Sequence, residues 1–167
     1  MILSIWWIKL KILKQLSNEF KLLIIGNGNA KNDLKNYVSK QNLKHRVKIL
    51  DAVEISELYY YTYNSDIGFC LIEPTNTNKL YSLPNKLFEY LYAGIPVLVI
   101  NLPELSSIIT KYKVGEIINP DNSDALIKIK KMQKTDYSKN IQKFQQEVNW
   151  KNEEKLFLKI LNDMVNQ

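Results

Sequence analysis

The sequence predicts an α/β protein built on a doubly wound parallel sheet of about five strands, with helices on both faces. Short continuous apolar runs alternate with longer segments of helical periodicity, and such runs are typical of parallel strands covered on both sides. Clusters of Gly, Asn, Asp and Pro separate the two kinds of segment. The 167 residues suffice for one domain with its own core.

The first elements follow from apolar periodicity. Residues 2–17 predict a helix with two apolar stripes separated by lysines, and a helix of this kind must bury both stripes. The apolar run 21–25 predicts a strand that ends in the turn Gly26–Asn29. A helix over 31–41 follows, which makes this region a strand–turn–helix unit.

The second unit begins with a predicted strand over 47–50. Ser56 is expected to cap a tyrosine-rich helix over 56–63, with Glu57 in its first turn. The nearly all-apolar run 67–72 predicts a third strand, and residues 73–81 form a polar loop. This strand therefore has the composition of one buried on both faces.

The last units repeat the alternation. A helix over 85–93 is expected to end at Gly94, and Ser123 is expected to cap a helix that runs to Met132. The other elements predicted in this part are strands over 97–100 and 115–118 and helices over 104–111, 137–148 and 151–165. No linker or internal repeat interrupts this series, so we expect a single domain over residues 1–167, with its core in 18–132 and C-terminal helices in 137–165.

Parallel strands joined by right-handed crossovers place the loops that follow them at one edge of the sheet. Ligands bind at this edge in open α/β sheets. The loops that the pattern brings there are Gly26–Asn29, Asp51–Val53, Glu73–Pro84 and Asn101–Glu104. Gly26 and Gly28 form a Gly-x-Gly turn, which lacks the third glycine of a dinucleotide fingerprint.

The segment Ser82–Pro103, SLPNKLFEYLYAGIPVLVINLP, carries the most specific chemistry. Pro84 opens a helix whose free amides and positive dipole end favour a diphosphate. Its entry comprises Ser82, Leu83, Pro84, Asn85 and Lys86. Ser82 can add a hydroxyl group and Lys86 a charge, or the segment simply starts a helix.

Glu89 is the acid within this otherwise apolar helix. A carboxylate there needs a partner or solvent, because burying it unpaired is costly. A ribose diol would supply two hydroxyl donors. The alternative is that Glu89 lies on the wet face of an amphipathic helix.

The segment resembles the signature of group 1, family 4-like glycosyltransferases of the GT-B fold, in their C-terminal nucleotide-sugar-binding domain. That signature is an acid, seven residues, a second acid and then a small-residue-Gly-x-Pro run. Glu89 matches the second acid and Ala93–Leu98 match the run, whereas Tyr81 occupies the place of the first acid.

The resemblance implies a Rossmann-like domain that forms half of a GT-B enzyme. It assigns Glu89 to the ribose of the donor, and the backbone of the loop ending at Val53 to the base. The family's first acid contacts the donor sugar, so Tyr81 implies that sugar recognition differs or has been lost. We therefore expect binding of a nucleotide-diphosphate sugar without a metal cofactor.

The function expected from the resemblance is donor binding in a hexosyltransferase of polysaccharide or glycoconjugate synthesis. It would be inactive as an isolated chain, because the acceptor site belongs to a separate domain or chain. A second hypothesis is a non-catalytic interaction module, or an inactive truncated remnant, that docks through Trp6, Trp7 and helix 56–63. A third is an open α/β nucleotide binder of the sugar-nucleotide epimerase type.

The amino-acid composition indicates which classes of binding partner the protein favours. The net charge of +6 favours anionic partners, but no block of five or six like charges indicates a nucleic-acid tail. The single cysteine, Cys70, excludes an internal disulfide, and the single histidine, His45, makes a metal site improbable. The apolar start is too short to span a bilayer. We expect a cytoplasmic protein whose N-terminal helix, with Trp6 and Trp7, is able to contact the inner membrane face peripherally.

Overall fold

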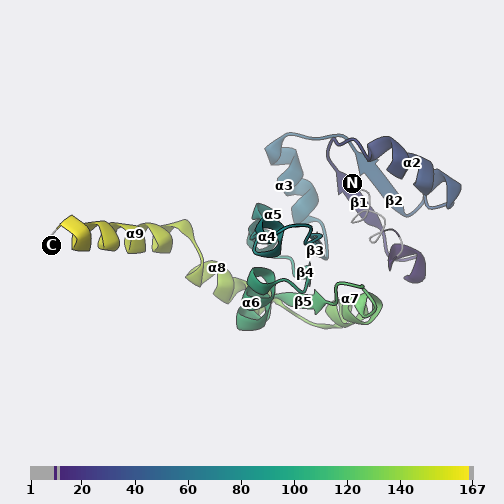
Figure 1. Cartoon of the computed structure of the whole chain (residues 1–167). Helices are drawn as coiled ribbons and strands as arrows, with labels where there is room; N and C mark the ends of the chain where they lie inside the picture. Colours follow the sequence, from purple (N-terminus) through teal and green to yellow (C-terminus); the bar gives the residue numbers. More distant parts are fainter. Residues whose placement is uncertain (1–9, 11, 166–167) are drawn as a thin grey trace.

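The computed structural model describes residue 10 and residues 12–165, and it shows parallel strands with helices packed around them (Figure 1). The strands are β1 (Leu22–Ile25), β2 (Val47–Leu50), β3 (Gly68–Cys70), β4 (Val97–Ile100) and β5 (Gly115–Ile118). The helices are α2 (Lys31–Lys40), α3 (Ile55–Tyr63), α4 (Thr77–Leu80), α5 (Asn85–Tyr92), α6 (Pro103–Tyr112), α7 (Ala125–Lys134), α8 (Ser138–Glu147) and α9 (Trp150–Val165). The predicted α/β class with parallel strands is therefore confirmed.

The strands form two parallel sheets and not the one continuous sheet expected from the sequence. One sheet pairs β1 with β2, and the other has the order β3-β4-β5. The N-terminal helical segment packs into the cores of both sheets. Its Leu10 and Leu13 pack into the core beside β1 and β2, whereas Ile12 and Leu16 pack into the core of the other sheet.

Side chains connect the two sheets where backbone hydrogen bonds do not. Phe20 and Phe69 pack against both hydrophobic clusters. Arg46 is buried, and its guanidinium donates hydrogen bonds to the carbonyl oxygens of Leu13, Ser17 and Phe20 at 2.8, 2.8 and 3.0 Å. These bonds tie the start of β2 to the end of the N-terminal helical segment and to the loop that follows it.

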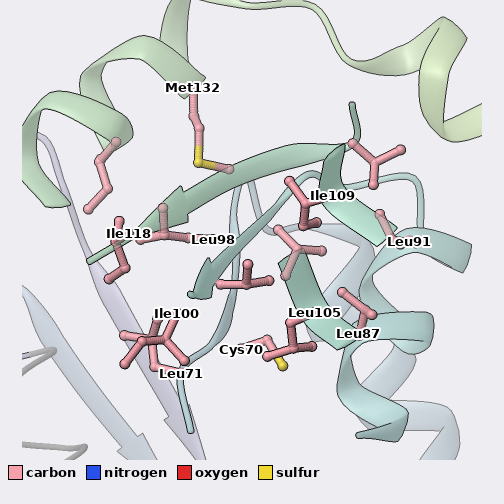
Figure 2. Close-up of a cluster of buried hydrophobic side chains, with 14 of the residues drawn as sticks. Cys70, Leu71, Leu87, Leu91, Leu98, Ile100, Leu105, Ile109, Ile118 and Met132 are labelled. Atoms are coloured by element: carbon pink, nitrogen blue, oxygen red, sulfur yellow. The ribbon is translucent and has the colours of Figure 1, made fainter. Parts of the chain in front are cut away.

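The larger core surrounds β4, whose four residues are all buried. Figure 2 shows Leu98 and Ile100 of this strand among side chains from the neighbouring helices, including Leu87 and Leu91 of α5 and Leu105 of α6. Cys70 is buried in the same cluster, as its apolar surroundings in the sequence predict. This burial explains the unbroken apolar composition of the strand.

The expected N-caps were wrong at two helices. Helix α3 begins at Ile55, so Ser56 lies inside it, and Glu54 takes the cap position without a side-chain hydrogen bond. Helix α7 begins at Ala125, and the Ser123 hydroxyl donates to Asp121 Oδ1 at 2.8 Å. Local turns of this kind compete with helix caps for short polar side chains.

The polar loop expected over 73–81 contains a short helix, α4. Asn76 caps it, because its side-chain oxygen accepts a hydrogen bond from the amide of Lys79 at 2.9 Å. Asparagine is among the favoured N-cap residues, so Asn76 could have indicated the start of this helix in the sequence.

The two ends of the chain differ in what the structure describes. In the helix expected over 2–17, residue 10 and residues 12–15 are helical, and residues 2–9 and 11 lie outside the described part.

At the C-terminal end, α9 extends away from the rest of the molecule (Figure 1). No residue of α9 is buried, although one of its faces is apolar.

Candidate functional site

The loop before α5 is shaped by local hydrogen bonds. Tyr81 ends α4 and is 56% exposed. The Ser82 hydroxyl donates to the carbonyl oxygen of Lys79 at 3.0 Å, and Leu83 is exposed. Pro84 has extended backbone angles and no side-chain cap bond, so the first amides of α5 are left without a side-chain acceptor.

One face of α5 borders a hollow of about 450 Å³. Asn85, Phe88, Glu89 and Tyr92 line it, and their spacing places them on one helical face. The opposite walls come from α3 and from the junction between α8 and α9. The remaining lining residues are Tyr59, Val148, Asn149, Trp150 and Glu153.

The carboxylate of Glu89 is available in this hollow. Glu89 is exposed, and within residues 12–165 its side chain has no hydrogen-bond or ion-pair partner. Burial raises the pKa of the neighbouring Tyr90 hydroxyl to about 12, with smaller contributions from Cys70 and from the charge of Glu89. An exposed, unpaired carboxylate is able to accept hydrogen bonds from a ligand.

A larger cleft of about 1330 Å³ lies between the two sheets. All four residues of β1 line it, as do Lys86 and Glu89 of α5. Lys21, Asp66 and Pro96 also line it, and these residues precede β1, β3 and β4. The cleft therefore reaches the amino ends of the strands, whereas the sequence predicted a crevice at their carboxyl ends.

The loops after β1 and β2 meet, as predicted for neighbouring parallel strands. Asn27 Oδ1 accepts hydrogen bonds from Lys31 Nζ at 3.2 Å and from the amide of Ala52 at 3.3 Å. Lys31 also forms an ion pair with Asp51. The hydrogen bond from Lys31, together with its charge, lowers the pKa of the Asp51 carboxyl.

The glycines of the first loop have different surroundings. Gly26 has φ +136°, a conformation that side chains rarely adopt. A methyl group added at Gly28 would have no other atom within 4 Å. The half-buried Val53 lies beyond Asp51 in the second loop. Gly26, Gly28 and Val53 line neither of the two clefts.

The structure thus brings together only part of the predicted set. Asn85 and Glu89 share the smaller hollow, and Lys86 lies with Glu89 at the larger cleft. Sequence reasoning missed Lys31 and the residues at the α8–α9 junction, above all Trp150. A lysine at the start of the helix that follows a Gly-rich turn could have indicated Lys31. Nothing near Trp150 in the sequence indicates that it lies beside α5.

Other candidate chemistry is limited. Over residues 12–165 and residue 10, no group of three or more His, Cys, Asp or Glu residues is placed to hold a metal ion. His45 is exposed. None of the helices in this same part of the chain has the length and apolar character needed to cross a bilayer.

Comparison with known proteins finds a family model and solved structures that are similar to this chain. The family model described as glycosyl transferases group 1 matches residues 9–158. The crystal structure of WaaG, a glycosyltransferase involved in lipopolysaccharide biosynthesis, is similar with a TM-score of 0.66 and 13% sequence identity. The match covers 85% of this chain but 39% of the WaaG chain, so the fold corresponds to a Rossmann-like half of a GT-B structure. No curated protein sequence matches the chain significantly.

Proposed function

This chain belongs to the group 1 glycosyl transferases, and we propose that it binds the nucleotide-diphosphate-sugar donor of such an enzyme. The observation that supports this role most is the placement of Glu89. Its carboxylate is exposed and unpaired among the described residues, on the helix face that borders the smaller hollow. Hydroxyl groups of a ribose would give this carboxylate its hydrogen-bond donors.

The diphosphate of the donor is assigned to the start of α5. Pro84 leaves the first amides of this helix without a side-chain cap, and the positive end of the helix dipole favours an anion there. Asn85 is the first residue of the helix and also lines the hollow that contains Glu89. A nucleotide is able to reach both groups when its phosphates lie at the helix start and its ribose lies one turn further along.

We propose that the sugar acceptor binds outside this chain. Glycosyl transfer requires donor and acceptor to be held together in a site that excludes water. The chain spans 39% of the length of WaaG, and the acceptor site is assigned to a further domain or chain. The proposed context is polysaccharide or glycoconjugate synthesis at the cytoplasmic side of a membrane.

Thermal shift measurements with UDP, GDP, ADP, TDP and CMP, and with their sugar conjugates, test donor binding. We expect one diphosphate to raise the melting temperature, with or without EDTA. We expect Glu89→Ala to weaken its binding at least about tenfold, because a hydrogen bond to a charged group contributes about 1.5–3 kcal/mol. Glu147→Ala removes an exposed carboxylate of α8 outside the hollow and serves as the matched control.

Equal nucleotide affinity of the Glu89→Ala variant and the unaltered chain would contradict the ribose role. A sugar conjugate that binds no better than its diphosphate would indicate that Tyr81, at the position of the family's first acid, no longer supports sugar recognition. Robust sugar transfer by the isolated chain would contradict the assignment of the acceptor site elsewhere.

A docking role is the second candidate, and the surface of α3 favours it. Ile55, Tyr60 and Tyr63 are 69%, 67% and 61% exposed. Exposed aromatic side chains are common anchors of protein interfaces. Absence of any nucleotide-dependent shift would favour this role, and Tyr60→Ala would then be expected to weaken complex formation with a partner.

A further inference from the structure

Three side chains join the loops that follow β1 and β2. Asn27 belongs to the first loop and Asp51 to the second, and Lys31 is the first residue of α2. The Lys31 ammonium donates hydrogen bonds to Asn27 Oδ1 at 3.2 Å and to the Asp51 carboxylate. Only 14% of the Lys31 side chain is exposed, whereas lysine side chains are mostly exposed in proteins. Lys31 is therefore held in place, and the two loops are connected through it.

The backbone of the second loop is fixed at the same point. Strands β1 and β2 are paired up to Ile25 and Leu50, and the amide of Gly26 donates to the carbonyl oxygen of Leu50 at 3.3 Å. Beyond this bond, the amide of Ala52 donates to Asn27 Oδ1 at 3.3 Å. The oxygen of an asparagine side chain accepts hydrogen bonds as a backbone carbonyl does. Asn27 thus extends the connection between the two strands into the loops.

The fixed loop presents backbone groups at its next residue. In the described part of the chain, neither the amide nor the carbonyl of Val53 has a hydrogen-bond partner. The residues on either side are engaged, because the amide of Ala52 is bonded to the first loop. The carbonyl oxygen of Glu54 accepts from the amide of Leu58 at 2.9 Å. A donor and an acceptor held in this way suit the polar edge of a nucleotide base.

This loop leads directly to the hollow that contains Glu89. Helix α3 begins at Ile55, two residues after Val53, and Tyr59 one turn later lines the hollow together with Glu89. One helical turn rises about 5.4 Å. A nucleotide whose ribose lies at Glu89 is therefore able to extend its base toward the loop before α3.

We propose that Asn27 and Lys31 are positioning residues, which hold the loop Asp51–Val53 in the conformation that receives the base of the donor nucleotide. Each acts through the second loop and needs no contact with the nucleotide itself. This inference rests on the proposed donor-binding function, with the base at this loop, and adds to it the side chains that keep the loop in place.

Calorimetry with UDP, GDP and ADP, and with ribose 5-phosphate as the ligand without a base, tests this inference. We expect Lys31→Ala to weaken the nucleoside diphosphate that binds best by about five- to tenfold, because a loop that must be ordered on binding lowers the affinity. The preference among the three bases should narrow, and ribose 5-phosphate should bind unchanged. Asn27→Ala should have the same effect, and Lys31→Arg should restore most of the affinity because it keeps the ion pair.

Two further variants separate positioning from a general effect of charge. Lys35→Ala removes an exposed lysine one turn further along α2 that donates to neither Asn27 nor Asp51, and it should leave the affinities and the base preference unchanged. Adding Asp51→Ala to Lys31→Ala should weaken binding no further, since both substitutions remove the same contact.

Hydrogen exchange gives a readout that does not depend on nucleotide binding. Amides of residues 51–54 should exchange faster in Lys31→Ala than in the unaltered chain. An unchanged base preference in both Lys31→Ala and Asn27→Ala, or an equal loss for ribose 5-phosphate, would overturn the inference even if exchange were faster. The donor-binding function would still stand if Glu89→Ala weakened binding in the same assay, whereas the failure of every nucleotide to bind would overturn both.

Discussion

Glu116 on β5 is a buried carboxylate whose charge is balanced by its neighbours. Lys128 and Lys131 of α7 lie 3.0 and 2.5 Å from its oxygens, and the Tyr137 hydroxyl donates to it at 3.2 Å. Burial raises the pKa of the Glu116 carboxyl, but the hydrogen bonds and charges of the two lysines outweigh it and leave the pKa below its ordinary value. Burial and the nearby Glu116 charge raise the pKa of Tyr137 to about 12. This group therefore connects β5, α7 and the start of α8.

We expect Glu116→Gln to lower the free energy of unfolding by about 1–2 kcal/mol at neutral pH, because it removes charge-assisted hydrogen bonds from partly exposed lysines. A carboxyl whose pKa is lowered in the folded state stabilises it above the unfolded pKa, about 4.5. That contribution is lost as the pH falls through the folded pKa. Urea unfolding of both proteins from pH 7 to pH 3 should show the difference narrowing below about pH 4.5.

The exposed pair Lys143–Glu147, with a separation of 3.8 Å, provides the control for this prediction. Glu147→Gln should change stability by less than about 0.5 kcal/mol, as is usual for exposed pairs four residues apart on a helix. A loss for Glu116→Gln no larger than this value would show that the buried network contributes nothing beyond a surface pair.

At the scale of the elements, the close pairing of β4 and β5 depends on a glycine. Gly115 lies opposite Val97 in the register of the two strands. A methyl group on Gly115 would collide with the backbone carbonyl of Val97. The backbone of β4 lies in the middle of the core and has no room to move away, so the requirement comes from tertiary packing.

Gly115→Ala is expected to destabilise the fold by about 3 kcal/mol, the upper part of the range for overpacked cores. Gly28→Ala is the matched control, because nothing lies within 4 Å of the added methyl group and φ is not positive there. It should be neutral or stabilising by less than about 1 kcal/mol. Thermal and urea unfolding measure both values, and equal stabilities would show that β4 and β5 separate at little cost.

Most helices and strands could be predicted from the sequence, because their positions depend on local interactions along the chain. Gly94 ends α5 with φ +82°, as expected for a glycine that follows a helix. The buried strand β4 occupies the predicted residues 97–100. The helix starts were less predictable, since Ser123 was able to bond to Asp121 as well as to cap a helix.

On the scale of the whole molecule, α9 is tied to the rest only at its start. Asn149 and Asn152 anchor the first turn, whereas Phe157, Ile160 and Met164 further along are 61%, 49% and 70% exposed. An isolated helix of this length is marginally stable in water, because helical stability in proteins comes mostly from packing. The described structure thus leaves an amphipathic helix without packing along most of its length.

Truncation after Lys155 is expected to change the free energy of unfolding by less than about 1 kcal/mol, since no residue of α9 is buried. Hydrogen exchange should be slow in α5 and α6 and should become faster along α9 toward Val165. Uniformly slow exchange along α9, or a large loss of stability on truncation, would contradict this prediction and show that the helix is packed in solution.

The sequence by itself determined the α/β class, most elements and the family signature around Glu89, because these depend on local periodicity, turn chemistry and residue spacing. Tertiary structure decided how these parts lie together. The strands form two sheets, and the N-terminal helical segment packs Leu10 and Leu13 into one core and Ile12 and Leu16 into the other. The α8–α9 junction reaches Glu89 through hydrogen bonds between residues more than fifty positions apart. No local pattern encodes such contacts, because they exist only once the chain is folded.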